Sequence, residues 1–170
     1  MATFTDHILQ GKSNLAFLSN INRDVNGYWD WQVTTCFYVA CHFMSAHVVN
    51  KTNKNYLSHT SVSDVINPTR VLSVGKIDEA TYLSYTKLYQ LSRRSRYLIN
   101  EKVAQNKGGA PQPDIQPCNL TYSTHFRKAV SHLEVVMNFM AKEYALTFSK
   151  TDLKCVDLNG MAFNYFNVLA

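Results

Sequence analysis

The sequence contains few charged residues and few residues that break helices. Only 17% of its 170 residues are Asp, Glu, Lys or Arg, whereas 46% are hydrophobic. This balance excludes a disordered tail, a collagen-like chain and a coiled coil. Four prolines and six glycines are also too few for a typical loop-rich all-β domain. We therefore expect a globular and mainly helical protein.

Cysteine is scarce too, and its spacing gives no metal or redox signal. None of the four cysteines belongs to a Cys-x-x-Cys pair, the usual spacing of zinc ligands and of thioredoxin-like sites. Cys36 and Cys41 lie in an apolar run and are expected to fill the core. The first residues lack the basic region and apolar stretch of a signal peptide. We expect no metal, no cofactor and a reducing, cytoplasmic location.

One segment has no charged side chain over the length of a membrane span. The 20 residues from Trp31 to Asn50 contain no Asp, Glu, Lys or Arg. They do include Gln32, His42 and His47, polar side chains that are costly in a bilayer. No second candidate span is available to pack against them. We expect no membrane contact, and instead a central helix that other helices surround.

Hydrophobic spacing predicts three long helices and several shorter elements. An apolar stripe at steps of three and four residues runs through the central helix, from Tyr28 to Val49. Further helices are expected at 6–20, 59–66, 78–106 and 124–147, and 161–169 is apolar enough to dock as a short helix or strand. Three of the four prolines fall in 107–117, which predicts an internal loop. The expected fold is one all-α domain over residues 1–170, an up-and-down bundle of four to five helices.

The positive charge is concentrated in one stretch of the chain. The net charge is +5, and residues 87–107 contain six basic residues and one acidic residue, which accounts for the whole excess. Tyrosines lie among these cations, and bases can stack on tyrosine while arginine holds phosphate. A solvated helix face, with the tyrosines in the core or in a dimer interface, is the alternative. The candidate nucleic-acid or phosphate site consists of Lys87, Arg93, Arg94, Arg96 and Lys102.

Two sequence blocks resemble those of a known helical superfamily. Residues 28–42 read Tyr-Trp-Asp-Trp-Gln-Val-Thr-Thr-Cys-Phe-Tyr-Val-Ala-Cys-His, and residues 89–97 read Tyr-Gln-Leu-Ser-Arg-Arg-Ser-Arg-Tyr. Over about residues 6–97 the chain resembles the HEPN superfamily, named for higher eukaryotes and prokaryotes nucleotide-binding. The likeness is to a prokaryotic branch with a Phe-Tyr-x-Ala-x-His block and a Ser-Arg-x-x-Arg-Tyr-like second helix.

The resemblance implies a bundle of four or five helices that forms a homodimer. Many members of the superfamily are metal-independent ribonucleases, often toxins or parts of antiviral systems, and others are binding modules without catalysis. The catalytic signature of the ribonucleases is an Arg and a His separated by four to six residues. In this chain only Arg127 and His132 have that spacing. The His would take a proton from a ribose 2′-OH, and the Arg would stabilise the attacked phosphate.

Helical geometry works against that pair. Five steps along an α-helix rotate a side chain by about 140° and raise it by about 7.5 Å. Arg127 and His132 would converge only through a long Arg side chain or a distorted helix. The leading prediction is therefore a non-catalytic HEPN-like module that binds RNA, a nucleotide or an antitoxin-like protein, in stress response or phage defence. A metal-independent endoribonuclease using Arg127 and His132 and a purely structural homodimer are the alternatives.

The other histidines give weaker signals. His42 belongs to the first block and is expected to be buried and hydrogen-bonded rather than an acid or base. Related chains often carry His-x-x-Arg after the next loop, but Val62 stands in the place of that Arg after His59. His7 and His125 lie near helix starts and are expected at the surface.

Overall fold

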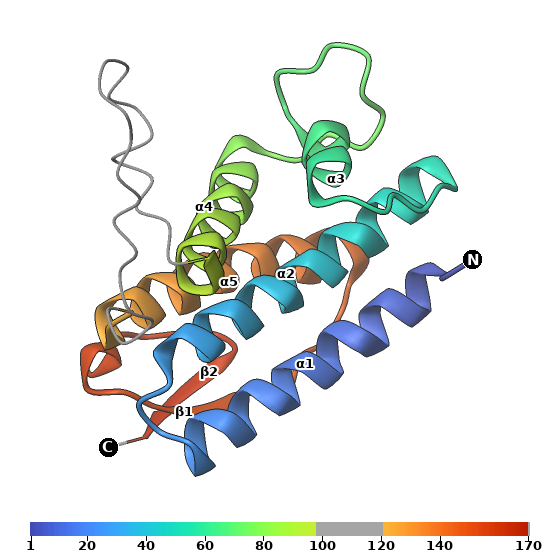
Figure 1. Ribbon diagram of the computed structural model, residues 1–170. Helices are drawn as coiled ribbons and strands as arrows, with labels where there is room; N and C mark the ends of the chain where they lie inside the picture. The colour runs from blue at the N-terminus through green and yellow to red at the C-terminus, as the bar shows by residue number, and fades with distance from the viewer. Residues whose placement is uncertain (98–120, 170) are drawn as a thin grey trace, which may run out of the picture.

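Five helices and a small C-terminal sheet make up the described part of the chain. The structure is a computed structural model that describes residues 1–97 and 121–169 (Figure 1). The predicted all-α bundle is confirmed for these residues, while the expected loop at 107–117 and Lys102 lie outside them. The helices are α1 (Phe4–Asp24), α2 (Trp29–Thr52), α3 (His59–Ile66), α4 (Glu79–Tyr97) and α5 (Ser123–Tyr144), followed by β1 (Thr151–Lys154), the 3-10 helix η2 (Val156–Leu158) and β2 (Phe166–Leu169).

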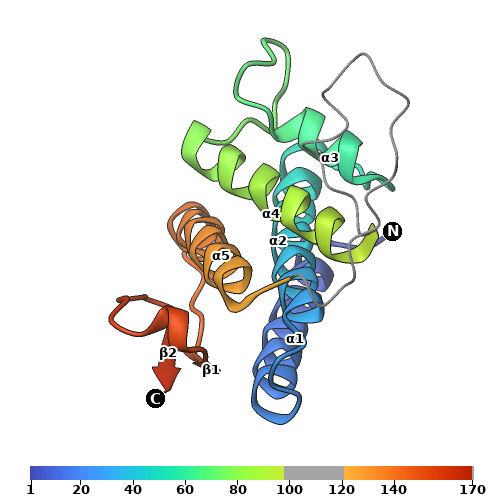
Figure 2. The ribbon, with the colours of Figure 1, turned by 60° about the vertical axis from the view of Figure 1, so that its left-hand side comes forward.

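Helix α2 lies at the centre of the bundle. It packs against α1, α3, α4 and α5, and two views show α1 running alongside it and α4 lying across it (Figure 1 and Figure 2). The six consecutive residues from Gln32 to Phe37 are all buried, so no side of this part of the helix faces solvent. Protein thus surrounds this part of the uncharged segment, although Trp31 and Tyr38 on either side of it are exposed. In the described ranges, no helix is both long enough and apolar enough to cross a membrane.

A capping box sets the start of α1. The Asp6 amide donates to the Thr3 hydroxyl (3.2 Å), and the Asp6 carboxylate accepts from the Thr3 amide (2.8 Å). These hydrogen bonds, from the Thr3 amide first and its hydroxyl second, lower the pKa of Asp6. The expected start at residue 6 is too late, because Asp6 is the third residue of the helix and Thr3 is its cap.

The residues after α5 form a two-stranded parallel sheet, so the expected short element at 161–169 contains a strand. The edge of β1 that faces away from β2 is covered by α1. The Lys154 amide donates to the Asn22 side chain (2.6 Å), which in turn donates to the Lys154 carbonyl (3.2 Å). The Ser19 hydroxyl donates to the Asp152 carbonyl (3.1 Å). These polar side chains of α1 satisfy backbone groups that would otherwise be left at a sheet edge.

Candidate nucleic-acid interface

Two arginines of α4 lie on the faces of tyrosine rings. The Arg93 guanidinium is 5.7 Å from the ring centroid of Tyr89, one helical turn earlier, and the Arg96 guanidinium is 5.8 Å from the ring centroid of Tyr38 on α2. Arg96 also donates from Nη1 to the Tyr38 hydroxyl (3.4 Å). A ring beneath a guanidinium favours the cation and restrains its plane. Both arginines are therefore oriented cations where α2 and α4 meet.

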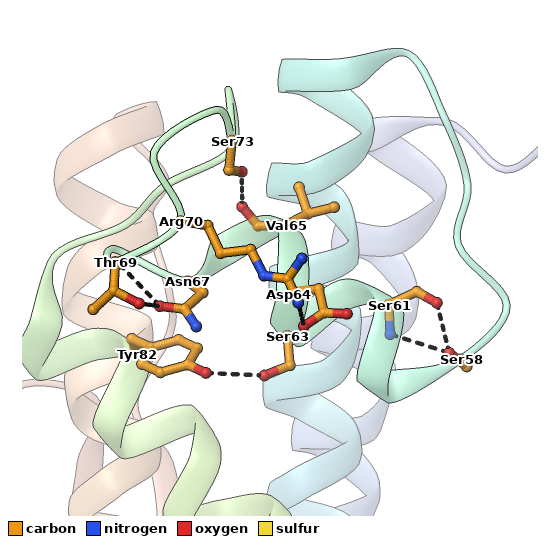
Figure 3. A network of polar contacts seen from close by, with 10 residues as sticks. All are labelled: Ser58, Ser61, Ser63, Asp64, Val65, Asn67, Thr69, Arg70, Ser73 and Tyr82. Carbon is orange, nitrogen blue, oxygen red and sulfur yellow. Dashed lines mark hydrogen bonds and ion pairs between the residues drawn. The ribbon is translucent and has the colours of Figure 1, made fainter.

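Polar contacts around α3 fix His59, the first residue of that helix. Ser58 caps the helix by accepting a hydrogen bond from the Ser61 amide (3.1 Å). The Ser63 hydroxyl contacts the Tyr82 hydroxyl of α4 (3.4 Å) (Figure 3). Further contacts tie α3 to the segment that leads into α4: Arg70 with Asp64 (2.7 Å), Ser73 with the Val65 carbonyl, and Thr69 with Asn67 (2.9 Å). Because α3 is held at both ends, His59 has a defined position against α2 and α4.

The His59 ring lies among aromatic side chains of α2 and α4. Its centroid is 5.0 Å from that of Phe37, 6.4 Å from that of Tyr38 and 5.9 Å from that of Tyr89. Its Nδ1 atom is 3.2 Å from the Cys41 sulfur. Burial raises the pKa of the Cys41 thiol to about 11, so the thiol keeps its proton at neutral pH and can donate it to Nδ1. In that arrangement the neutral imidazole carries its own proton on Nε2.

His59 and Arg96 share Tyr38 as a neighbour. The pKa of His59 is lowered by burial and then by the positive charge of Arg96, so its imidazole is neutral at pH 7. Tyr38 is 37% exposed, which leaves part of its ring open to solvent. A guanidinium, a neutral N–H donor and a partly open aromatic ring thus meet at one place. We call the following residues the Arg–His surface: Tyr38, His42, His59, Tyr89, Arg93 and Arg96.

His42 is close enough to His59 for the charge of His59 to affect its pKa, and a hydrogen-bonded chain of side chains leads from His42 to His7 and Asn55. His7 Nε2 is 3.1 Å from the Asn55 side-chain oxygen, which can only accept, so His7 donates from Nε2 and accepts at Nδ1. His42 Nδ1, 3.3 Å from His7 Nδ1, is then the donor, and its Nε2 is left as an acceptor. Burial, followed by the charges of His7 and His59, lowers the pKa of His42. His7, expected at the surface, is half-buried because of these contacts.

The remaining cations of the basic stretch lie elsewhere. Burial is the main cause of the lowered pKa of His132 on α5, and the charge of the exposed Lys87 lowers this pKa further. Burial also lowers the pKa of His125 at the start of α5, and the charge of the exposed Arg94 lowers it further. Lys102 lies outside the described residues. Of the five expected phosphate-binding residues, Arg93 and Arg96 lie on tyrosine rings that neighbour His59, whereas the charges of Lys87 and Arg94 act on histidines of α5.

Arg127 and His132 point to different neighbours. His132 is half-buried, and its Nδ1 atom is 3.4 Å from the Ser84 hydroxyl on α4. Arg127 has a buried Nε atom with no hydrogen-bond partner in the part of the chain that the structure describes. Burial raises the pKa of Cys155, next to η2, and the nearby Arg127 charge opposes that shift. The structure does not bring the two side chains to a common partner, and their catalytic role stays a prediction.

No family model, curated protein or solved structure matches this chain. Membership of the HEPN superfamily, with the dimer and the activities that it implies, therefore stays a prediction. Within residues 1–97 and 121–169, no group of three His, Cys, Asp or Glu side chains could hold a metal ion. The Arg–His surface is thus defined by its own geometry alone.

Sequence reasoning missed three residues of this neighbourhood. Tyr38 belongs to the first sequence block but carries no charge that predicts a phosphate site, and Val62 breaks the His-x-x-Arg pattern after His59. The cation beside His59 comes from Arg96, 37 positions further along the chain. Cys41 was interpreted as a core residue, and its contact with His59 could not be foreseen. One feature of the sequence does predict the position of His59. It directly follows Ser58, a residue type that caps helices, which places the histidine at a helix start.

Acid should destabilise the protein through its histidines. Burial is the largest cause of a lowered pKa at five of the six histidines: His42, His47, His59, His125 and His132. The unfolded chain, with values near 6.5, therefore binds protons at higher pH than the folded chain. The stabilisation is fully present above pH 6.5 and is lost as the pH falls through the lower folded-state values.

The measurement is a thermal melt followed by circular dichroism at several pH values. We expect Tm to fall by about 5 °C or more between pH 7.5 and pH 5.0. The carboxylates with lowered pKa values titrate below this window and do not interfere. A Tm that stays constant over this range would contradict the neutral, buried state of these histidines.

Proposed function

We propose that the Arg–His surface binds the phosphate groups of RNA or of a nucleotide. The observation that carries this proposal is that Arg93 and Arg96 each lie on a tyrosine ring, and that both of these rings neighbour the His59 imidazole. A guanidinium presents several N–H donors in a plane that matches phosphate oxygens.

His59 adds a donor whose strength depends on the ligand. Arg96 lowers the pKa of His59, so the free site holds a neutral imidazole. A phosphate bound between them would reverse that effect, because an anion stabilises the imidazolium. Binding should therefore tighten as the pH falls from 8 toward 6, within the range where the fold is stable. The Tyr38 ring, partly exposed beside Arg96, offers a platform for a base attached to the phosphate.

The test is fluorescence anisotropy with a labelled 12-nucleotide single-stranded RNA at 50 and 200 mM salt. Replacing both Arg93 and Arg96 with glutamine should weaken binding about tenfold or more, because two phosphate contacts disappear. The slope of log K against log salt should become shallower by about 1.4, the value for two contacts with a single strand. The matched control replaces Lys12 and Lys142 with glutamine, which removes the same charge from exposed positions on α1 and α5.

Three outcomes separate this proposal from the alternatives. Equal loss of affinity in the Arg93/Arg96 and Lys12/Lys142 variants would show a general charge effect and contradict a site. If neither RNA nor nucleoside triphosphates bind at 50 mM salt, the purely structural homodimer is the hypothesis that remains. Cleavage of RNA in EDTA that disappears in His132→Ala but not in His59→Ala would favour the endoribonuclease instead.

A further inference from the structure

The segment between α3 and α4 presents apolar side chains to solvent. Val71, Leu72 and Val74 are 84%, 94% and 71% exposed. The segment stands out from the bundle beyond α3 in both views (Figure 1 and Figure 2). Single exposed apolar side chains are ordinary on a protein surface, whereas several gathered at one place mark an interaction site. These three residues are therefore candidates for contact with a partner.

Hydrogen bonds hold this segment in one conformation. The Ser73 hydroxyl donates to the Val65 carbonyl of α3, and the Ser73 amide donates to the Arg70 carbonyl (3.2 Å). The Arg70 guanidinium pairs with the Asp64 carboxylate of α3 (2.7 Å) (Figure 3). The segment thus presents its apolar side chains in a defined arrangement. A partner that covers them loses little affinity to the ordering of this segment.

A cavity of about 560 Å³ opens beside the exposed side chains. It lies between the end of α2, helix α3 and the segment before α4. Among the described residues that line it, the charged ones are Asp64 and Arg70, which pair with each other. The volume is within the range of ligand pockets and leaves room for a bulky apolar side chain. We call the apolar residues of the lining the loop patch: Tyr56, Val65, Val71, Leu72 and Val74.

The unpaired charges next to the loop patch are positive. Lys54 is exposed and lies two positions before Tyr56 in the chain. Lys76 is exposed, and its Nζ atom donates to the Val71 carbonyl (3.0 Å). In the described ranges, neither lysine forms an ion pair, unlike Lys51 at the end of α2, which pairs with Glu143 (2.8 Å). A partner that covers the loop patch is therefore favoured if it carries acidic side chains.

We propose that the loop patch binds a protein segment in which a bulky apolar side chain is flanked by acidic residues. The apolar side chain fills the cavity and contacts Val71 and Leu72, and the acidic residues pair with Lys54 and Lys76. Burial of the apolar groups provides affinity, and the complementary charges select the partner. No residue of the loop patch belongs to the Arg–His surface, so this interaction is independent of the proposed phosphate binding.

Two other occupants suit the loop patch less well. In a two-fold dimer the same surface of each copy meets, which brings Lys54 and Lys76 of one copy toward the same lysines of the other. A lipid surface requires backbone groups that are satisfied within the protein. The amides of Val71, Leu72 and Val74 have no hydrogen-bond partner within residues 1–97 and 121–169. Self-association and binding to lipid are outcomes that the test must distinguish.

The test begins with selection of a phage-displayed library of random 12-residue peptides on the full chain. Peptides with a bulky apolar residue flanked by Asp or Glu should be enriched. Replacing Val71 and Leu72 together with glutamine should weaken binding of these peptides about tenfold or more, because anchoring contacts disappear. The matched control replaces Leu9 and Leu83 with glutamine, which removes two exposed leucines from α1 and α4 and should leave binding unchanged.

A charge exchange tests the acidic part of the proposal and shows that the variant is folded. Replacing Lys54 and Lys76 with glutamate should weaken binding of the enriched peptides about tenfold or more. Peptides in which the acidic residues are changed to lysine should bind this variant and not the wild type. Such a rescue requires an intact loop patch, so a misfolded variant cannot produce it.

Four results would overturn the proposal. The first is an absence of enriched peptides of this kind, and the second is equal weakening in the Val71/Leu72 and Leu9/Leu83 variants. The third is self-association of the wild type, measured by analytical ultracentrifugation, that the Val71/Leu72 variant abolishes. The fourth is sedimentation with vesicles of phosphatidylcholine and phosphatidylserine that the same variant abolishes, which would make the loop patch a lipid-binding surface.

Discussion

Replacing Gly11 with valine should lower the free energy of unfolding by about 3 kcal/mol or more. Gly11 of α1 packs directly against Phe43 of α2, and a Cβ atom at Gly11 would be 2.4 Å from Cε1 and 2.7 Å from Cδ1 of Phe43. The Phe43 ring is completely buried, so it cannot move aside without displacing its neighbours. Glycine is disfavoured in helix interiors by about 1 kcal/mol relative to alanine. At this position the steric conflict outweighs that preference.

Chemical denaturation with urea measures the effect, and a double-mutant cycle tests its cause. Gly11→Ala should also destabilise, against the helix-propensity trend. Phe43→Leu shortens the opposing ring, so Gly11→Ala should cost clearly less in that background, with a coupling of about 1 kcal/mol or more. If Gly11→Ala instead raises the free energy of unfolding, the result contradicts the close contact between Gly11 and the Phe43 ring. Ala16→Val, at an exposed position of α1, is the control and should change stability by less than about 1 kcal/mol.

Replacing His47 with leucine should cost about 2–3 kcal/mol of stability. His47 is buried in α2, and its Nε2 donates to the Gly75 carbonyl (2.9 Å) in the segment before α4. Its Nδ1 accepts from the Tyr144 hydroxyl of α5 (2.7 Å). One side chain therefore ties three parts of the chain together, and burial keeps it neutral by lowering its pKa. Leucine preserves the apolar volume but leaves the buried Gly75 carbonyl without its donor.

The matched variant is His47→Gln, whose amide N–H can still reach the Gly75 carbonyl. We expect it to lose less than half of the stability that His47→Leu loses. For a chain of this size, each kcal/mol lowers Tm by about 2–4 °C, so both variants can be ranked by differential scanning calorimetry. Equal Tm values for the two variants would mean that packing, and not the hydrogen bond, explains the effect.

Sequence periodicity was sufficient to locate the helices because their faces are buried in the expected way. The 59–66 helix has the predicted bounds, and the uncharged run in α2 is the centre of the bundle. The errors fall at the ends of elements. Capped by Thr3, α1 begins at Phe4 rather than at residue 6, and α5 begins one residue earlier than expected, where the Tyr122 amide donates to His125 (3.0 Å). Such hydrogen bonds span only three residues and leave no trace in a hydrophobic pattern.

At the candidate site, the spacing of hydrophobic residues no longer predicts which side chains lie together. Arg93 and Arg96 were named from charge alone, and the structure places both on tyrosine rings. Charge alone gives equal weight to Lys87 and Arg94, whose charges instead act on the α5 histidines His132 and His125. Residues two or five positions apart on a helix point in different directions, so a dense run of cations is divided between faces.

The sequence by itself determined that this chain is helical, where its long helices lie, which one is central and where the positive charge is concentrated. Those properties depend on residues within a few turns of one another. The tertiary structure decided that His59 of α3 and Arg96 of α4 share Tyr38 and that His47 joins three segments. These contacts depend on how separate elements pack and on which direction each side chain points, and neither is encoded in the spacing of any single helix.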